Sequence, residues 1–385
     1  MKIIICGGHL TPALSVINKL KIENHELWGK DQVLFVGRKY PLEGETTVSA
    51  EQKIIAQMGI PFIPLTTGRL QRKFTRYTIP SLLKIPIGFF QALWWTKKFK
   101  PDIILSFGGY VALPVVVAGW FLRVPIVTHE QTVVSGLANK IIGMLAKKIC
   151  VSWPGSVKNF PASKVILTGN PVRREIFEIK KTPLLPVSHA LYPMIYVTGG
   201  SLGSHWINEA VLQCLPQLLE KYVVVHQCGE SEKYRDWEKL KAQSASWRTK
   251  LKRELKERYF LTKYVEPEDI GWVLNRADLV VSRAGANILA ELAALGKPAL
   301  FIPIPWASGD EQTKNAQMLA DVGIAEILPQ RELDGKRLFA EISKMIKNLK
   351  KYQKNAELAK RLIDLEAAAK IVKVVKEIYA QRRKD

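Results

Sequence analysis

Two stretches of this chain, far apart in the sequence, begin in the same way. Ile3–Gly8 (IIICGG) and Ile195–Gly200 (IYVTGG) each join a short apolar run to paired glycines, and a helical pattern follows. A buried strand, a glycine turn and a helix are typical of the first βα unit of a doubly wound parallel sheet. The sequence therefore predicts two sheets of this kind in one chain.

Further apolar runs alternate with helical patterns after each opening. The first series is Lys2–Cys6, Gln32–Val36, Ile103–Ser106, Ile126–Thr128 and Val165–Thr168, and the second is Met194–Thr198, Val223–His226, Leu279–Ser282 and Ala299–Ile302. Such alternation predicts parallel strands covered by helices on both faces. The predicted fold class is α/β, with two Rossmann-like domains that face each other across a cleft and bind ligands at the carboxyl ends of their strands.

A stretch with little periodicity separates the two series. Residues 173–193 contain Lys180-Lys181 and three prolines, which predicts a linker. The predicted domains are therefore an N-terminal one over 1–172 and a C-terminal one over 194–360. A final helix over 361–385 is expected to pack back on the N-terminal domain.

Composition restricts the environment and the partners of the chain. The 385 residues are 47% hydrophobic, enough for two packed cores, and the four cysteines are scattered without a metal-binding spacing. This cysteine usage fits a reducing cytoplasm. The formal net charge of +22 predicts an anionic partner, either nucleic acid or a membrane surface, and charge alone does not choose between them.

An uncharged run over Ile103–Leu122 is about as long as a membrane span. Gly108-Gly109 and Pro114 interrupt it, and its first residues are typical of a strand. A strand, a glycine turn and a buried helix are the better interpretation.

His9 is the first candidate for catalysis. It follows Gly7-Gly8, and Thr11-Pro12 is predicted to supply the N-cap and first residue of a helix. A helix N-terminus disfavours imidazolium, which leaves a neutral imidazole able to accept a proton. A turn or capping histidine is the alternative. His129-Glu130-Gln131 places three more polar residues at the exit of a strand, a less specific signal.

The second half has three candidate ligand-binding loops. The turn Gly199–Ser204 offers backbone N–H groups and the Ser201 hydroxyl to phosphate, although ordinary βα turns have the same composition. Ser282–Asn287 repeats the arrangement, and Glu291 in the following helix suits ribose hydroxyls or merely complements the helix dipole. The loop before the next helix carries Asp310-Glu311-Gln312, which suit sugar hydroxyls or cap the helix.

No metal site is predicted. The sequence lacks an Asp-x-Asp motif and any His, Cys and carboxylate cluster with ligand spacing. A diphosphate leaving group would then be stabilised by backbone dipoles and cationic side chains.

The segment Arg69–Lys100 combines basic residues with apolar and tryptophan-rich patches. This mixture suits attachment to an anionic membrane surface. Stacking on nucleic acid bases and burial in the core are the alternatives. The membrane is favoured because Ile, Leu and Phe outnumber groups that read bases.

Taken together, these motifs resemble those of the MurG-type lipid I N-acetylglucosaminyltransferases of peptidoglycan synthesis, which have the GT-B fold. The resemblance spans essentially the whole chain. Its carriers are Gly7-Gly8-His9 with Pro12-Ala13, Phe107–Val111, His129–Gln131, Gly169–Arg173, Gly199–Ser201, Ser282–Leu292 and Asp310–Ala316.

The resemblance implies inverting transfer of N-acetylglucosamine from UDP-GlcNAc to the C4 hydroxyl of lipid I (undecaprenyl-pyrophosphoryl-MurNAc-pentapeptide), without metal or cofactor. It also implies a peripheral enzyme on the cytoplasmic face of the bacterial inner membrane, with no nucleic acid partner. The implied base is His9. Implied donor-binding residues are Arg173, Ser201, Arg283, Ala284, Gly285, Glu291, Glu311 and Gln312. Implied acceptor-binding residues are Gly7, Gly8, Gly108, Gly109, Tyr110, His129, Glu130, Gln131 and Thr132. A related transferase with another lipid acceptor, such as a diacylglycerol, and a basic nucleic-acid-binding protein remain as alternatives.

Overall fold

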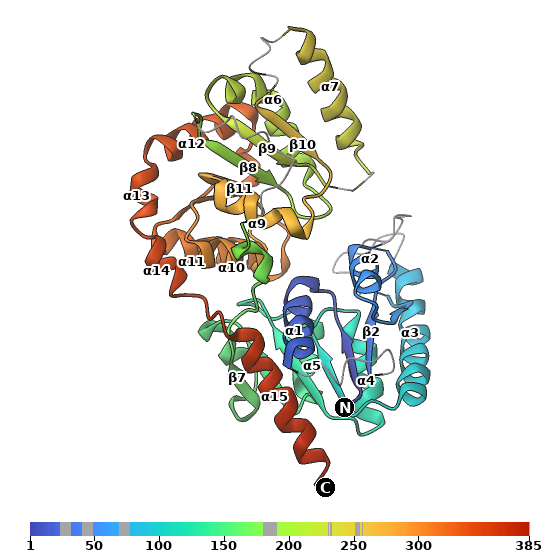
Figure 1. Cartoon of the computed structure of the whole chain (residues 1–385). Coiled ribbons are helices and arrows are strands. Elements are labelled where there is room, and N and C mark those ends of the chain that lie inside the picture. The colour runs from blue at the N-terminus through green and yellow to red at the C-terminus, as the bar shows by residue number, and fades with distance from the viewer. Residues whose placement is uncertain are drawn as a thin grey trace. The chain divides into compact units, whose positions relative to one another are not determined.

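The structure is a computed structural model that describes residues 1–23, 32–40, 49–68, 78–179, 191–229, 231, 233–250, 255 and 257–384. Residues 69–77 of the basic, aromatic segment and 180–190 of the expected linker lie outside these ranges. The chain divides into two compact units (Figure 1). The N-terminal unit comprises Met1–Arg173 and Asp364–Asp385, and the C-terminal unit comprises Arg174–Ile363.

The N-terminal unit contains a seven-stranded parallel sheet in the order β3-β2-β1-β4-β5-β6-β7. Its strands are β1 (Ile3–Cys6), β2 (Val33–Gly37), β3 (Phe62–Pro64), β4 (Ile103–Ser106), β5 (Ile126–Glu130), β6 (Lys148–Val151) and β7 (Val165–Leu167). Its helices are α1 (Leu10–Glu23), α2 (Ala50–Gln57), α3 (Thr78–Phe99), α4 (Ala112–Phe121), α5 (Leu137–Leu145) and α15 (Ala367–Arg382), with 3₁₀ turns η2 (Pro154–Asn159) and η3 (Ala162–Lys164). Every residue of β1, β2, β4 and β5 is buried, including the polar residues Thr128, His129 and Glu130 at the end of β5.

The C-terminal unit repeats this arrangement with a six-stranded parallel sheet in the order β10-β9-β8-β11-β12-β13. Its strands are β8 (Met194–Thr198), β9 (Val223–Gln227), β10 (Tyr259–Thr262), β11 (Leu279–Ser282), β12 (Ala299–Phe301) and β13 (Ala325–Ile327). Its helices are α6 (His205–Lys221), α7 (Asp236–Lys250), α9 (Pro267–Arg276), α10 (Ala286–Leu295), α11 (Glu311–Val322), α12 (Gly335–Lys347), α13 (Leu349–Gln353) and α14 (Ala356–Lys360), with 3₁₀ turns η4 (Arg174–Phe177), η6 (Ser308–Asp310) and η7 (Gln330–Glu332).

The last helix belongs to the N-terminal unit. Apolar residues of α15, among them Ile371, Val375 and Ile378, join the core formed by β1 and α1. At the surface Lys376 Nζ lies 2.6 Å from a carboxylate oxygen of Glu23, and Arg382 donates to the Pro101 carbonyl. The chain therefore leaves this unit, builds the second one and returns to complete the first.

The expected α/β architecture is confirmed, and so is the interpretation of the uncharged run, which forms β4, a glycine turn and α4. Four strands were missed: β3, β6, β10 and β13. Three of the four lie at sheet edges, where the strands have only three or four residues and are partly buried, so each gives a short apolar run. Within the described ranges, no helix combines the length and the hydropathy needed to cross a membrane.

Two glycines bring backbone segments of the C-terminal unit into direct contact. A Cβ atom on Gly203 would lie 1.8 Å from the Cys228 carbonyl oxygen, and one on Gly229 would lie 2.1 Å from the Gly203 nitrogen. The loop that precedes α6 therefore packs against the loop after β9 through backbone atoms alone.

We predict that Gly203→Ala lowers the free energy of unfolding by roughly 3 kcal/mol, because the methyl group forces the two loops apart. Gly200→Ala is the matched control. Gly200 also has a positive φ of 88°, but a Cβ there meets nothing within 4 Å. Gly200→Ala should lower the free energy of unfolding by only about 1 kcal/mol, because it adds backbone strain alone. Urea unfolding measures both, and equal losses would contradict the contact argument.

Candidate functional site

The first candidate turn joins β1 to α1 beside the turn that follows β4. Cys6 pairs with Ser106 in the sheet, so the two chains leave it side by side. Gly7 has a φ of 142°, and a Cβ there would lie 2.8 Å from the carbonyl carbon of Phe107. The Gly8 amide donates to the Gly108 carbonyl oxygen at 3.1 Å. The paired glycines thus allow the two turns to touch at the point where strand order reverses, the usual ligand position in such sheets.

His9 lies at this point and is half-buried. Its Nδ1–H donates to the Phe107 carbonyl oxygen at 3.0 Å, which leaves the lone pair of a neutral imidazole on Nε2. Burial lowers the pKa of His9 below its usual value, while the Phe107 hydrogen bond and the charge of Glu130 oppose this shift. His9 is therefore held as a neutral base. The expectation that Thr11 is the N-cap was wrong: α1 begins at Leu10, directly after His9.

Gly108 and Gly109 both have positive φ angles, 69° and 81°. The Gly109 amide donates to Asn139 Oδ1 at 2.7 Å, and Asn139 Nδ2 donates to Glu130 Oε2 at 2.8 Å. Sequence reasoning missed Asn139, which stands on α5, thirty positions after the turn that it holds. Its only signal was a polar residue on a largely apolar helix. Tyr110, also expected here, is half-buried.

The Glu130 carboxylate is buried and bound by groups of the chain itself. Besides Asn139, the amide and the hydroxyl of Thr132 donate to its Oε1 atom at 3.1 and 2.8 Å. These three hydrogen bonds compensate for the burial of a charge. In this geometry Glu130 and Thr132 help to fix the conformation of the Gly108-Gly109 turn. The sequence placed Glu130 after its strand, whereas β5 extends through it.

His129 and Gln131 are also buried, with 0% and 1% of their surface exposed. His129 Nε2–H donates to the Gly169 carbonyl oxygen at 3.3 Å, and burial lowers the pKa of His129 to about 4. Both polar atoms of the Gln131 side chain lack a hydrogen-bond partner within the part of the chain that the structure describes. A buried amide without protein partners is available to a bound polar ligand.

In the C-terminal unit, the turn after β8 is held by one buried amide. Gln227 Nε2 donates to Thr198 Oγ1 and to the Gly200 carbonyl oxygen at 3.1 and 3.0 Å. Its Oε1 accepts from the Tyr196 hydroxyl and the Val265 amide. Gln227 therefore fixes the shape of the glycine turn from the adjacent strand β9. Nothing in the local sequence distinguished it from other residues at strand ends.

Two helix N-termini lie at adjacent strand ends in this unit. Thr198 pairs with Ser282, so the turn that leads to α6 and the turn that leads to α10 leave the sheet side by side. Ser201 is exposed, and Gly285 is the N-cap of α10. Backbone N–H groups at helix N-termini bind anions, so two helix starts at one edge make it suited to a diphosphate.

The guanidinium group of Arg283 donates hydrogen bonds to groups of its own unit. Nη1 donates to the carbonyl oxygens of Ile302 and Pro303 at 2.8 and 3.3 Å, and Nη2 donates to Gln330 Oε1 at 2.6 Å. Burial lowers the pKa of Arg283 to about 10. The side chain thus joins the end of β11 to the end of β12. The next two residues, Ala284 and Gly285, form the backbone that leads into α10.

The other expected donor-binding residues lie on different elements of the chain. Glu291 lies in the second turn of α10 and is 2% exposed. Glu311 and Gln312 open α11, where Gln312 Oε1 accepts from the Ile304 amide at 3.1 Å. Arg173 is the last residue of the first segment of the N-terminal unit.

Two family descriptions match the chain, the glycosyltransferase family 28 N-terminal domain over residues 6–151 and its C-terminal domain over 194–375. A relative from Clostridium botulinum named UDP-N-acetylglucosamine--N-acetylmuramyl-(pentapeptide) pyrophosphoryl-undecaprenol N-acetylglucosamine transferase is 34% identical over 366 residues, 93% of this chain and 95% of its own length. A Bacillus cereus relative, with the same name and the suffix 2, is 34% identical over 360 residues, 91% and 93% of the two chains.

Solved structures show the same architecture. Acinetobacter baumannii MurG aligns with a TM-score of 0.65 and 26% identity over 98% of this chain and all of its own. The UDP-GlcNAc 2-epimerase of Neisseria meningitidis aligns with a TM-score of 0.64 over 98% of this chain, and at 14% identity this likeness concerns the fold alone.

We predict a loss of stability in mild acid from the buried His129. Its pKa is about 4 in the folded state against about 6.5 in the unfolded chain, so the unfolded state binds the extra proton. The contribution of the neutral His129 to the free energy of unfolding is complete above pH 6.5 and falls by about 3 kcal/mol as the pH approaches 4. Urea unfolding at stepwise pH measures this slope. His129→Gln should flatten it, and an unchanged slope in that variant would contradict the assignment.

Proposed function

The chain belongs to glycosyltransferase family 28, and from this membership we propose that it transfers N-acetylglucosamine from UDP-GlcNAc to the C4 hydroxyl of lipid I, forming lipid II. The observation that supports this most is the pair of glycine turns, one at the switch point of each parallel sheet. The curated relatives that carry this activity in their names match more than nine tenths of the chain. One turn serves the lipid-linked acceptor and the other serves the nucleotide donor.

On the donor side, we assign the UDP diphosphate to the N-termini of α6 and α10. Backbone amides around Ser201 and Gly285 bind its oxygens, and the partial positive charge of both helices favours the UDP leaving group. Glu291 accepts from the ribose hydroxyls, and Gln312 with Glu311 binds the sugar hydroxyls. Arg173 adds positive charge near the phosphates. Arg283 acts through its backbone, since its guanidinium already has three partners.

On the acceptor side, we assign the lipid diphosphate and its sugar to Gly7-Gly8 and Gly108-Gly109, together with Tyr110 and Gln131. His9 Nε2 carries the lone pair that removes the proton of the C4 hydroxyl, directly or through one water. The hydroxyl oxygen then attacks the anomeric carbon as the bond to UDP breaks, and the configuration inverts. The proton ends on His9 and the electron pair on the UDP phosphate.

We propose that this reaction needs no divalent metal. The charge of the leaving diphosphate is met by the two helix N-termini and by basic side chains, so a metal ion has no required role in the step. Transfer that continues in EDTA tests this part separately from the rest.

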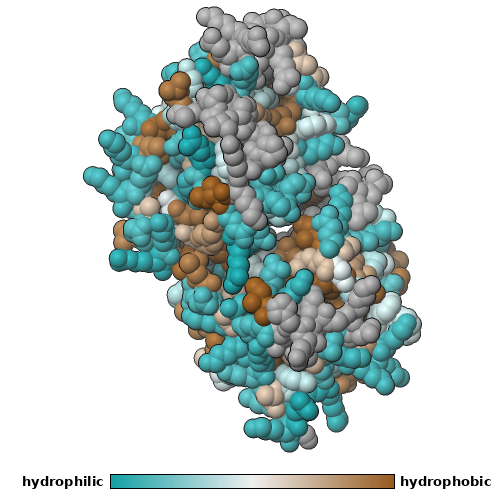
Figure 2. All heavy atoms as spheres, viewed as in Figure 1, coloured by the Kyte–Doolittle hydropathy of each residue, from teal (hydrophilic) through white to brown (hydrophobic). Residues whose placement is uncertain are grey.

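A membrane-binding surface is proposed on α3 and α4, at the right-hand edge of the N-terminal unit in Figure 1, where Figure 2 shows brown hydrophobic residues within the teal surface. The exposed apolar residues that form this α3–α4 patch are Ile79, Leu83, Ile87, Phe90, Trp94, Trp120 and Phe121. Those on α3 recur every three or four residues and so form one stripe along the helix. Lys98 Nζ lies 4.7 Å from the Trp94 ring centre, which joins positive charge to the apolar surface.

An apolar stripe with lysines at its border suits the headgroup region of an anionic membrane. The proposed location is therefore the cytoplasmic face of the inner membrane, where lipid I would be presented to the acceptor turn. Phe121 of the α3–α4 patch also packs against the half-buried Phe89, with the ring centres 5.9 Å apart, so this part of the patch rests on a further aromatic residue.

The central experiment is transfer of labelled sugar from UDP-GlcNAc to a short-chain lipid I analogue, with EDTA present. Labelled disaccharide-lipid establishes donor, acceptor and metal independence together. Saturable UDP-GlcNAc binding without product would redirect the acceptor assignment to another lipid, such as a diacylglycerol. Absence of both would overturn the proposed function.

Two substitutions should separate chemistry from donor binding. His9→Ala removes the base and should lower kcat by roughly 10²–10⁴-fold while the affinity for UDP stays unchanged. Glu291→Gln replaces the carboxyl group assigned to the two ribose hydroxyls and should weaken UDP binding by roughly tenfold or more. Steady-state kinetics and UDP titration measure both variants, and each serves as the other's control. Normal turnover without His9 would remove it as the base.

The α3–α4 patch predicts a further separation. Phe90→Ser with Trp94→Ser should weaken binding to phosphatidylglycerol vesicles by roughly tenfold to a hundredfold, since two apolar side chains no longer enter the lipid. Turnover of a water-soluble acceptor should not change. Leu358→Ser, at an exposed leucine of the C-terminal unit, is the matched control. Equal vesicle binding by all three proteins would contradict the assigned surface.

A further inference from the structure

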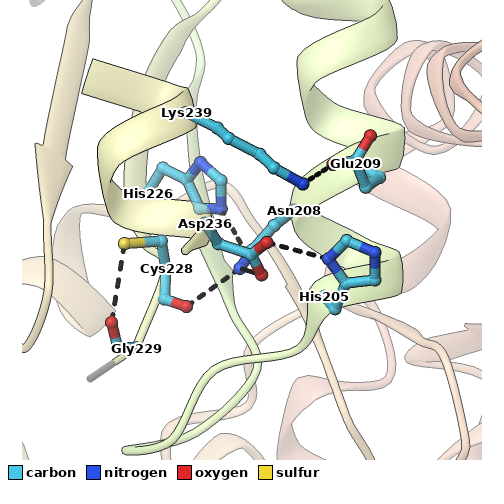
Figure 3. A network of polar contacts seen from close by, with 8 residues as sticks. All are labelled: His205, Asn208, Glu209, His226, Cys228, Gly229, Asp236 and Lys239. Carbon is cyan, nitrogen blue, oxygen red and sulfur yellow. Dashed lines mark hydrogen bonds and ion pairs between the residues drawn. The ribbon is translucent and has the colours of Figure 1, made fainter. Parts of the chain in front are cut away.

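A buried polar network lies at the start of α6, immediately after the donor-side glycine turn (Figure 3). At its centre is Asp236, the first residue of α7, which is 8% exposed. Its Oδ1 accepts from His205 Nδ1–H and its Oδ2 from Asn208 Nδ2, both at 2.8 Å. His205 and Asn208 belong to the first turn of α6, so one carboxylate holds that turn at two points.

The network continues toward the interior of the unit, and its hydrogen bonds can all form at once with a single assignment of donors and acceptors. The Asn208 amide also donates to the Cys228 carbonyl oxygen at 3.0 Å, and its Oδ1 accepts from His226 Nε2–H at 3.0 Å. His226 Nδ1 in turn accepts from the Tyr259 hydroxyl at 3.0 Å. Burial lowers the pKa of His226 to about 3, so the ring stays neutral and this arrangement persists. Each side-chain hydrogen of Asn208 has one acceptor.

The network and the glycine turn share a backbone contact. Gly203 packs directly against Cys228 and Gly229, and Asn208 binds the same Cys228 carbonyl from the other side. Rotation or withdrawal of the first turn of α6 would break both contacts together. The direction of the amides that precede α6 therefore depends on Asp236, which comes from a different helix.

A metal ion is the other ligand that these side chains suggest, because ligand atoms of His205, Glu209 and Asp236 lie within 4.8 Å of one another. Three features oppose it. Both α6 and α7 begin here, and their N-termini disfavour a cation. Lys239 Nζ already lies 3.6 Å from Glu209 Oε1. Asp236 has a hydrogen-bond donor at each oxygen.

We infer that Asp236 is a positioning residue for the donor's diphosphate, acting through His205 and Asn208 on the backbone amides of the turn Gly199–Ser204. The inference rests on the proposed donor site at this turn. It adds a residue from α7, outside every motif that pointed to the nucleotide. The ligand concerned is the diphosphate of a nucleotide sugar.

The test compares Asp236→Ala with Asp278→Ala in the full-length protein. Asp278 Oδ2 accepts from the Met194 amide at 2.8 Å, at the opposite end of β8 from the glycine turn. Both variants lose one buried or half-buried carboxylate acceptor. Only Asp236→Ala should raise the dissociation constant of UDP and the KM of UDP-GlcNAc, by about tenfold or more, with kcat little changed. Thermal unfolding of each variant records the purely structural loss.

Asp236→Asn provides the rescue variant. Its oxygen can accept from Asn208 while its amide donates to Nδ1 of the other His205 tautomer, so UDP affinity should return to within about threefold of the original. UDP affinity unchanged in Asp236→Ala, or lost equally in Asp278→Ala, would overturn the inference. The inference would also be overturned if Asp236→Asn bound UDP no better than Asp236→Ala. That result would mean that the charge of Asp236 is required, for example to bind a cation, and not its hydrogen bonds. If the unaltered protein does not bind UDP, the proposed function fails as well, whereas UDP binding without transfer leaves the inference intact.

Discussion

The parallel pairing of β1 with β4, and of β8 with β11, is the constraint on which both halves of this protein depend. At each of these pairs the strand order reverses, so two loops leave the sheet side by side with no helix between them. In the N-terminal unit a side chain would keep the loops apart, and Gly7 therefore stands where a Cβ would lie 2.8 Å from the carbonyl carbon of Phe107. The proposed donor and acceptor sites both use this geometry, because it brings a turn to the start of a helix at the carboxyl edge of the sheet.

Much of the fold followed from the sequence, because a strand buried on both faces is mostly apolar, as Ile3–Cys6 is throughout and Leu279–Ser282 is up to its last residue. Edge strands such as β3 have no such requirement and were missed. Of the candidate site, the glycine turns and His9 could be proposed from the sequence, since the features that suggest them are local. Asn139, Gln227 and Asp236 were not, because each acts on a turn about thirty residues away and no spacing along the chain encodes that contact.

The same physical device recurs at both turns. A carboxamide offers donors and an acceptor without a net charge, so away from solvent it can join groups of two segments at little desolvation cost. Asn139 does so for the turn after β4, and Gln227 and Asn208 do so around the turn after β8. Arg283 shows the contrasting case of a charged side chain: the resemblance implied that it binds the donor, whereas its guanidinium donates to carbonyl groups of its own unit.

The return of α15 to the N-terminal unit bears on how the chain is made. The C-terminal unit is one continuous segment, Arg174–Ile363, whereas the core around β1 and α1 includes Ile371 and Ile378 from the end of the chain. During synthesis the second unit therefore has all its residues before the first unit has all of its own. The face of α1 that α15 covers stays open to solvent until the residues of α15 have been made, so the core around β1 is completed only after the whole C-terminal unit has been synthesised.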